Sequence, residues 1–152
     1  METADIYITI SRKAPRAGPG SYIAVLEATT ASGQTGTKTL RKRIDECTPH
    51  SLELMAIIDA FKCFTRNCSV RIHSDHGWMQ SIRTNGWLDR WREQDFKKGG
   101  ADITHADLYR QLESIETTRG LTIDEVNADL GSYTIWLKSE IEREKQTEKE
   151  KK

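Results

Sequence analysis

Two short stretches, Ser51-Leu52-Glu53-Leu54-Met55-Ala56 and Arg71-Ile72-His73-Ser74-Asp75, carry most of the information in this chain. In the first, an acid stands at the opening of an apolar helix, and in the second an acid closes an apolar strand. Carboxylates at the ends of such elements suit Mg²⁺, which is usually held by one or two carboxylates together with substrate phosphates. A phosphodiester substrate is therefore the first function to consider.

The composition favours one domain without an overall charge bias. The chain has 152 residues, of which 36% are hydrophobic, enough for a single core. Lys+Arg and Asp+Glu both number 23, so any binding of a polyanion must come from a local patch. The three cysteines, Cys47, Cys63 and Cys68, form no zinc-binding pattern and are expected to be reduced.

Neither a membrane span nor a secretory signal is expected. No apolar run approaches the roughly 20 residues that cross a bilayer. The first residues, Met1-Glu2-Thr3-Ala4-Asp5, are acidic where a signal peptide is basic. These features predict a soluble, cytoplasmic protein without a membrane partner.

The N-terminal part of the chain predicts three antiparallel strands. Ile6, Ile8 and Ile10 alternate with polar residues, which is the period of a half-buried strand whose isoleucines face the core. Pro and Gly residues then force a turn. The strands are expected at residues 4–11, 21–30 and 37–44, with connections at 12–20 and 31–36.

Helices and two further strands are expected after this hairpin. The first helix should begin near Thr48-Pro49, because Thr suits the N-cap and Pro the first helical position. The expected ranges are a helix to about 66, a strand over 69–75, helices over 76–84 and 87–96, a helix from 104 or 105 to 119, a strand over 121–126 and a helix over 132–145. This order predicts an α/β (α+β mixed) fold, in which helices flank a five-stranded mixed sheet and the 69–75 strand is central and parallel.

The C-terminal residues differ from the rest. We expect the domain to cover residues 1–139, because residues 140–152 are nearly all charged and offer no apolar positions for docking. This segment is therefore expected to be a frayed helix or tail. It is also the expected contact surface if the fold serves as a scaffold for a protein partner.

Several motifs in a fixed order resemble the ribonuclease H family, in its type 1, bacterial-like branch. They cover the family's glycine-rich turn, two carboxylate-bearing elements, a tryptophan-bearing helix with a basic protrusion, and the helix that follows. In this chain they are Gly18-Pro19-Gly20-Ser21-Tyr22, Glu53-Leu54-Met55-Ala56, Ser74-Asp75, Trp87-Leu88-Asp89-Arg90-Trp91 with Phe96-Lys97-Lys98, and Ala106-Asp107-Leu108-Tyr109-Arg110-Gln111-Leu112. The resemblance extends over nearly the whole chain.

The resemblance implies a ribonuclease H-like fold that binds an RNA/DNA hybrid and hydrolyses its RNA strand with Mg²⁺ or Mn²⁺. It makes Glu53 and Asp75 the candidate catalytic and metal-binding residues. The residues that it implies for nucleic-acid binding are Trp87, Arg90, Trp91, Lys97 and Lys98. Because tryptophans four apart share one helix face, a place in the core is an equal alternative for this pair. Of the two, we expect Trp91 to be the more exposed.

Two of the family's four metal-binding carboxylates are missing here. Ile10 stands where the family's first acid bridges both ions, and no acid stands at the fourth position, within Ser132-Tyr133-Thr134-Ile135-Trp136. Asp5 is on the same strand as Ile10, but an odd separation places it on the opposite face. Glu53 and Asp75 supply two negative charges against the four positive charges of a metal pair. We therefore expect binding of Mg²⁺ or Mn²⁺ to be weak or absent.

Other side chains could complete the site. Asp129 is the first candidate for a displaced catalytic acid, and Asp124 or Glu125 could reach the site from the last strand. His73 or His76 could add a nitrogen ligand, although each is also explained as an ordinary strand or helix-start residue.

Both remaining acids also have a structural interpretation. An acid in a first helical turn gains about 0.3 to 1 kcal/mol from the helix dipole, which is a sufficient role for Glu53. An Asp at a strand end often caps the element that follows, which is a sufficient role for Asp75.

Three functions follow, and the sequence leaves open whether the protein is an enzyme. The first is a ribonuclease H-like domain that binds RNA/DNA hybrid, with hydrolysis lost or strongly reduced. The second is an active Mg-dependent endoribonuclease that uses Glu53, Asp75 and a displaced acid. The third is a catalytically dead scaffold for protein–protein interaction.

Overall fold

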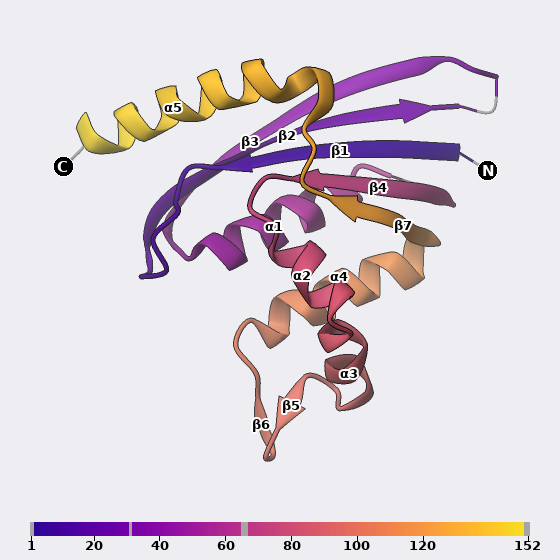
Figure 1. The fold of residues 1–152 in the computed structure, drawn as a ribbon. Coiled ribbons are helices and arrows are strands. Elements are labelled where there is room, and N and C mark those ends of the chain that lie inside the picture. The colour runs from indigo at the N-terminus through magenta and orange to yellow at the C-terminus, as the bar shows by residue number, and fades with distance from the viewer. Residues whose placement is uncertain (1, 31, 65–66, 151–152) are drawn as a thin grey trace.

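A five-stranded mixed sheet forms the centre of the molecule (Figure 1). The computed structural model describes residues 2–30, 32–64 and 67–150. The strands lie in the order β3-β2-β1-β4-β7, where the first three are antiparallel and β4 is parallel to both of its neighbours. Their bounds are β1 Glu2–Ile10, β2 Gly18–Thr29, β3 Thr35–Cys47, β4 Cys68–Ser74 and β7 Leu121–Asn127. The predicted mixed sheet, with an interior parallel strand, is confirmed.

The helices cover both faces of this sheet, but unequally. Figure 1 shows α5 alone on one face, while the other four helices lie on the opposite side. Their bounds are α1 Pro49–Phe61, α2 Trp78–Thr84, α3 Trp87–Glu93, α4 Ala106–Arg119 and α5 Thr134–Glu150, with a 3₁₀ turn at Gly131–Tyr133 before α5. Within the described residues, no helix is both long enough and apolar enough to span a bilayer.

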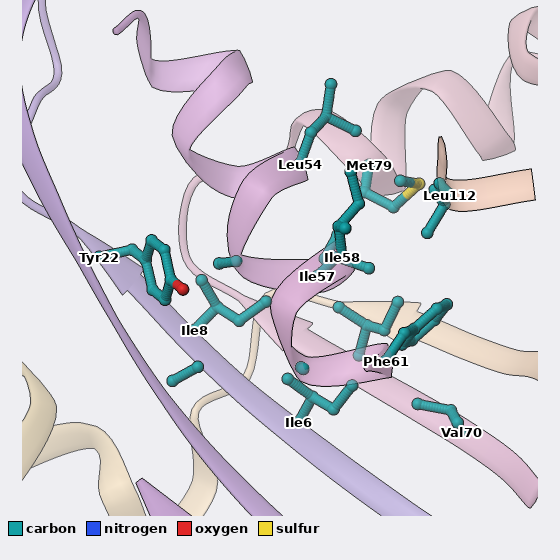
Figure 2. Packing of buried hydrophobic residues seen from close by; sticks show 14 of the residues in the cluster. Ile6, Ile8, Tyr22, Leu54, Ile57, Ile58, Phe61, Val70, Met79 and Leu112 are labelled. Carbon is teal, nitrogen blue, oxygen red and sulfur yellow. The ribbon is translucent and has the colours of Figure 1, made fainter. Parts of the chain in front are cut away.

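The larger core lies between the sheet and α1 (Figure 2). Ile6, Ile8 and Ile10 are completely buried on this face, as the alternation of β1 predicted. Leu54 and Ile57 of α1 pack against them in the same cluster. Burial of each such side chain contributes roughly 1.5 to 3 kcal/mol, so this face fixes the register of β1.

A smaller core joins α5 to the other face of the sheet. Ile23 and Val25 of β2 meet Leu137 and Ile141 there. The helix runs without a break past residue 140, and Ile141 is only 4% exposed, so it provides the apolar docking position that we did not expect in this segment. The limits of the domain at residues 1–139 stay a prediction.

Several helix limits follow from local chemistry. Thr48 caps α1 in a reciprocal capping box with Ser51, as the Thr-Pro start predicted. This helix ends at Phe61 and not near residue 66, a position outside the described residues. Gly120 ends α4 at a φ of +64°, a conformation that suits glycine. The sequence did not reveal the hairpin of β5 (Lys97–Lys98) and β6 (Ala101–Asp102), whose strands have two residues each.

Candidate nucleic-acid interface and carboxylate site

Glu53 is completely buried and binds the start of α2. Its Oε2 accepts a 2.6 Å hydrogen bond from Ser74 Oγ, at the end of β4, and its Oε1 accepts a 2.5 Å bond from Met79 N. Backbone N–H groups in a first helical turn have no partner within the helix, so this carboxylate supplies one. The prediction that Glu53 interacts with the dipole of its own helix is wrong, because Glu53 lies beyond the first turn of α1.

Both oxygens of Glu53 are therefore already engaged within the core. Burial raises the pKa of this carboxyl group, while the bonds from Ser74 and the α2 backbone lower it. Desolvation is the largest of these effects, so the charged form is disfavoured. Glu53 acts here as an internal link between α1, β4 and α2.

Asp75 lies just beyond β4 and points to different partners. Its Oδ2 accepts a 3.0 Å hydrogen bond from Thr9 Oγ1. Its Oδ1 is buried, accepts no hydrogen bond from any described residue, and lies 3.8 Å from Lys13 Nζ. The expected capping role is not seen, because Gly77 is the N-cap of α2.

The position of the family's first carboxylate is filled by a hydrocarbon. Ile10 has no exposed surface and belongs to the core beneath α1. Asp5 lies on the other face, as the alternation predicted, where it contacts His73 Nε2 at 2.8 Å and Arg71 Nε at 2.9 Å. No acid therefore replaces the missing group from within this strand.

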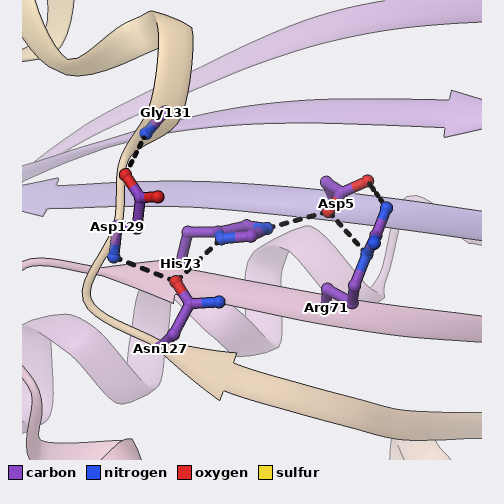
Figure 3. A network of polar contacts seen from close by, with 6 residues as sticks. All are labelled: Asp5, Arg71, His73, Asn127, Asp129 and Gly131. Atoms are coloured by element: carbon purple, nitrogen blue, oxygen red, sulfur yellow. Dashed lines mark hydrogen bonds and ion pairs between the residues drawn. The ribbon is translucent and has the colours of Figure 1, made fainter.

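Asp129 is also committed elsewhere (Figure 3). Its Oδ1 accepts a hydrogen bond from Gly131 N, and its own N–H donates to Asn127 Oδ1, both at 2.9 Å. The same Asn127 oxygen lies 2.9 Å from Nδ1 of His73. Asp129 thus shapes the turn before α5, and within the described residues no hydrogen bond or ion pair joins it to Glu53 or Asp75.

The acidic groups do not fit a pair of divalent ions. In the described part of the chain, no three His, Cys, Asp or Glu side chains are grouped as metal ligands. Two ions about 3.5 to 4 Å apart need a cluster of acids around them. Here Glu53 is buried, Ile10 stands in place of the first acid, and Asp75 and Asp129 belong to separate networks.

Aromatic rings gather on α2, α3 and α4. The ring centroids of Trp78, Trp87 and Trp91 lie 6.2 to 6.5 Å from one another. Trp91 also contacts Tyr109 at 5.5 Å, and Trp78 Nε1 donates a 3.1 Å hydrogen bond to the Tyr109 hydroxyl. The expected order of exposure is wrong, because Trp87 is 37% exposed while Trp91 is half-buried against the core.

His50 extends these rings toward the start of α1. Its ring stacks on Trp78 with centroids 3.9 Å apart, and its Nδ1 lies 2.8 Å from Nε2 of His76. Burial is the main cause that lowers the pKa of both histidines, and Lys13 lowers that of His76 further. We call His50, Trp78, Trp87 and Trp91 the aromatic surface. Trp78 and His50 were missed as members, although the Asp75-His76-Gly77-Trp78 order next to the strand end was a usable signal.

Basic side chains border the aromatic surface. Arg90 is exposed on α3, and Lys97 and Lys98 are exposed on β5. Neither Arg90 nor Lys98 forms an ion pair with another residue in the described ranges. The hairpin is held to α4 by Arg110, whose Nη2 lies 2.8 Å from Asp102 Oδ1. The structure thus brings the predicted aromatic and basic residues into one region, while Glu53, Asp75 and Asp129 have separate partners.

The chain resembles known ribonucleases H in sequence and in fold. No protein-family model matches it. Over 100 residues, or 64% of its length, it is 30% identical to a ribonuclease H from Thermoanaerobacter sp. (strain X514), and it spans 61% of that relative. Its fold matches the crystal structure of LC9-RNase H1, a type 1 RNase H with the type 2 active-site motif, with a TM-score of 0.67 and 16% identity over 83% of this chain and 62% of that chain.

A second fold match comes from a virus. The foamy viral protease-reverse transcriptase in complex with RNA/DNA hybrid gives a TM-score of 0.61 with 15% identity, covering 89% of this chain and 18% of that chain. The fold is therefore a ribonuclease H-like fold. The chain is thus similar in sequence to ribonucleases H and shares their fold, which confirms the resemblance found in its sequence.

Proposed function

We propose that this chain is a nucleic-acid-binding domain for RNA/DNA hybrid in which hydrolysis of the RNA strand is lost or strongly reduced. One observation carries the proposal. The aromatic surface and the exposed basic groups of α3 and β5 are assembled, while the acids that would hold metal ions are divided among unrelated contacts. The first arrangement supports nucleic-acid binding, and the second supports a loss of hydrolysis.

The physical basis of binding is stacking together with charge neutralisation. An exposed aromatic ring that stacks on a base or sugar contributes about 1 to 3 kcal/mol per base. Within the aromatic surface, Trp87 is the exposed ring, while His50, Trp78 and Trp91 are partly buried. Arg90, Lys97 and Lys98 would neutralise backbone phosphates, which makes the affinity depend on salt.

The loss of hydrolysis follows from charge and geometry. A metal pair brings four positive charges, and Glu53 accepts two hydrogen bonds inside the core instead of facing solvent. Asp75 alone would compensate a bridged pair poorly. Mg²⁺ or Mn²⁺ would therefore bind weakly or not at all.

The binding test is a fluorescence anisotropy titration with labelled RNA/DNA hybrid, duplex DNA and duplex RNA. We expect preference for the hybrid and a linear fall of log affinity with log salt, with a slope near −0.9 for each neutralised phosphate of a duplex. Lys38→Ala is the matched control, because Lys38 is an exposed lysine on β3. Affinity that ignores salt, or no binding at low salt, contradicts the proposal.

Active endoribonuclease function is the second candidate. It is favoured by the relative named ribonuclease H, of which the chain spans less than two thirds. A cleavage assay on hybrid with Mg²⁺ or Mn²⁺ decides between the two. Activity that appears in the wild type and vanishes in Asp75→Asn would establish this candidate over the first.

Protein interaction through the last helix is the third candidate, and it is favoured by two exposed side chains. Ile135 is 84% exposed and Trp136 is 43% exposed at the start of α5. Removing residues 140–152 would also delete the buried Ile141, so Ile135→Ser is the cleaner variant for a pull-down comparison. Loss of a captured partner in Ile135→Ser, with hybrid binding absent, would favour this candidate.

We also propose a cytoplasmic location. No disulfide joins any of the cysteines in the described residues. Proteins in reducing compartments keep thiols reduced, which is consistent with this location. Fractionation of expressing cells would test it, and recovery outside the cytoplasm would contradict it.

A further inference from the structure

The carboxylate of Asp75 has a cationic neighbour that the chain itself supplies. Lys13 belongs to the loop between β1 and β2, and its Nζ lies 3.8 Å from Asp75 Oδ1. That oxygen is buried and accepts no hydrogen bond from the described residues, while Oδ2 is occupied by the Thr9 hydroxyl. Lys13 is therefore the charge partner of Asp75 Oδ1, the oxygen of this carboxylate that accepts no hydrogen bond from the described residues.

The loop that carries Lys13 is tied down on both sides. The N–H of Ser11 donates to the carbonyl of Ser21 at 2.9 Å, which closes the base of the loop. Arg12 Nε donates to the carbonyl of Arg16 at 2.6 Å, which holds its interior. These contacts hold the backbone on both sides of Lys13, so the residue is kept near the end of β1.

Close packing behind the loop adds to this constraint. A Cβ at Gly20 would lie 2.8 Å from Leu52 Cδ1 and 2.9 Å from Cys47 Sγ, so the strand can approach α1 only because this residue is glycine. The start of β2 is thereby pressed against the helix that carries Glu53. From this loop, Lys13 reaches Asp75 beyond the end of β4.

The side chain of Lys13 is open to solvent, while the Asp75 oxygen that it faces is buried. The side chain of Lys13 is 50% exposed and that of Asp75 is 24% exposed. A cation placed in this way neutralises the carboxylate on one side and remains open to an anion on the other. A metal ion that bridges a carboxylate and a phosphate has the same two contacts.

We propose that Lys13 is a built-in monovalent cation at Asp75, which takes the place of a divalent ion there and links this carboxylate to a backbone phosphate of the bound nucleic acid. The link to phosphate rests on the proposed hybrid-binding function, whereas the exclusion of metal does not. A Mg²⁺ ion bound to Asp75 Oδ1 would lie about 2.0 to 2.1 Å from that oxygen. It would be repelled by the ammonium group a few ångströms away.

The first test measures Mn²⁺ binding directly, by the loss of the free Mn²⁺ signal in electron paramagnetic resonance. The variants are Lys13→Met, Lys13→Met with Asp75→Asn, and Lys38→Met as a matched removal of one exposed lysine. A single charge within about 4 to 6 Å shifts binding of a cation such as H⁺ by about one to three powers of ten. Because Lys13 is half exposed, we expect Lys13→Met to bind Mn²⁺ about tenfold more tightly than the wild type.

The other two variants are the controls for this measurement of Mn²⁺ binding. Lys38→Met should match the wild type, and Asp75→Asn in the Lys13→Met background should abolish the gain. Equal Mn²⁺ affinity in Lys13→Met and wild type would overturn the inference, as would a gain that survives Asp75→Asn. Thermal melting of each variant confirms that it is folded.

The second test compares hybrid affinity in EDTA and in Mg²⁺. Mg²⁺ should give the wild type no gain in affinity, since added cations compete for the phosphates, whereas Lys13→Met should bind more weakly than the wild type in EDTA and regain affinity when Mg²⁺ is added. A wild type that needs Mg²⁺ for binding would overturn the inference. Complete absence of hybrid binding would remove the proposed function and the phosphate link, while the Mn²⁺ measurement would still decide whether Lys13 excludes metal.

Discussion

The aromatic surface and the carboxylate positions lie on connected elements, yet their side chains are arranged in opposite ways. In the first region, Trp78 lies at the centre of rings from α1, α2 and α3. In the second, Glu53 and Asp75 share no hydrogen-bond partner among the residues that the structure describes. Each stacking ring contributes by itself, whereas a metal pair needs all of its ligands at once. A binding surface can therefore persist after a metal site has lost one member.

The largest expected effect is on stability, at the filled position of the first carboxylate. Ile10→Asp removes a completely buried side chain and places a charge in the core, so it should cost more than about 3 kcal/mol in the free energy of unfolding. Urea denaturation measures this, with Ile10→Val as the control at about 0.5 to 1.5 kcal/mol. A stable Ile10→Asp variant that gains Mn²⁺ binding would show that the geometry of the metal site is retained.

The next effect concerns Glu53 as a link within the core. Glu53→Ala leaves the hydroxyl of Ser74 and the N–H of Met79 without their acceptor, which should cost about 2 to 3 kcal/mol. Glu53→Gln should change stability by less than about 1 kcal/mol, since it keeps polar contacts and removes a buried charge. If Gln is as harmful as Ala in chemical denaturation, the charge itself is needed.

Substitution on the aromatic surface should affect binding more than folding. Trp87→Ala should weaken hybrid affinity by about 1 to 3 kcal/mol, and it should lower the melting temperature less than Trp91→Ala, because Trp87 is 37% exposed while Trp91 packs against the core. Anisotropy titration and thermal melting separate the two effects. A variant that binds hybrid normally would assign the ring to the fold alone.

A basic residue on the hairpin should have a smaller effect that depends on salt. Lys98→Ala should reduce the magnitude of the salt slope by about 0.9 if the lysine neutralises one phosphate of a duplex. The measurement is the hybrid titration repeated at several salt concentrations, beside Lys38→Ala. An unchanged slope would remove Lys98 from the interface.

The smallest expected effect is a pH dependence of stability from His50. Burial is the main cause that lowers the pKa of His50, and the nearby His76 and His105 lower it further. Glu53 acts in the opposite direction and raises this pKa. The folded state therefore favours the neutral ring, so its contribution to stability is present above the unfolded pKa, about 6.5, and is lost as the pH falls through the lower folded value. Denaturation of wild type and His50→Gln between pH 7 and 5 should show a shallower decline in the variant; an equal decline would contradict this.

Local patterns predicted most of the fold. The isoleucine alternation located β1 and its buried face, and Thr48-Pro49 located the start of α1, because both signals depend on neighbouring residues only. The role of Glu53 was not predictable in this way, since its partner Met79 comes 26 residues later on another helix. The resemblance to the family directed attention to the metal and away from this link.

The difference between local signals and contacts between distant elements also explains the errors at the aromatic surface. Trp87 and Trp91 share one helix face, and their exposure depends on Tyr109, which belongs to α4 and packs on Trp91. Stacking of His50 on Trp78 likewise joins two elements that are separated along the chain. The β5–β6 hairpin was missed because two-residue strands carry no periodicity.

The hydrogen-bond network around His73 connects distant parts of the chain at one imidazole ring (Figure 3). The ring contacts Asp5 on β1 and Asn127 on β7, and Tyr7 stacks on it with centroids 4.4 Å apart. Through Asn127, the connection reaches the turn that leads into α5. Opening of the C-terminal helix should therefore loosen the middle of the sheet, so that amide protons of β1, β4 and β7 exchange with deuterium as one cooperative unit.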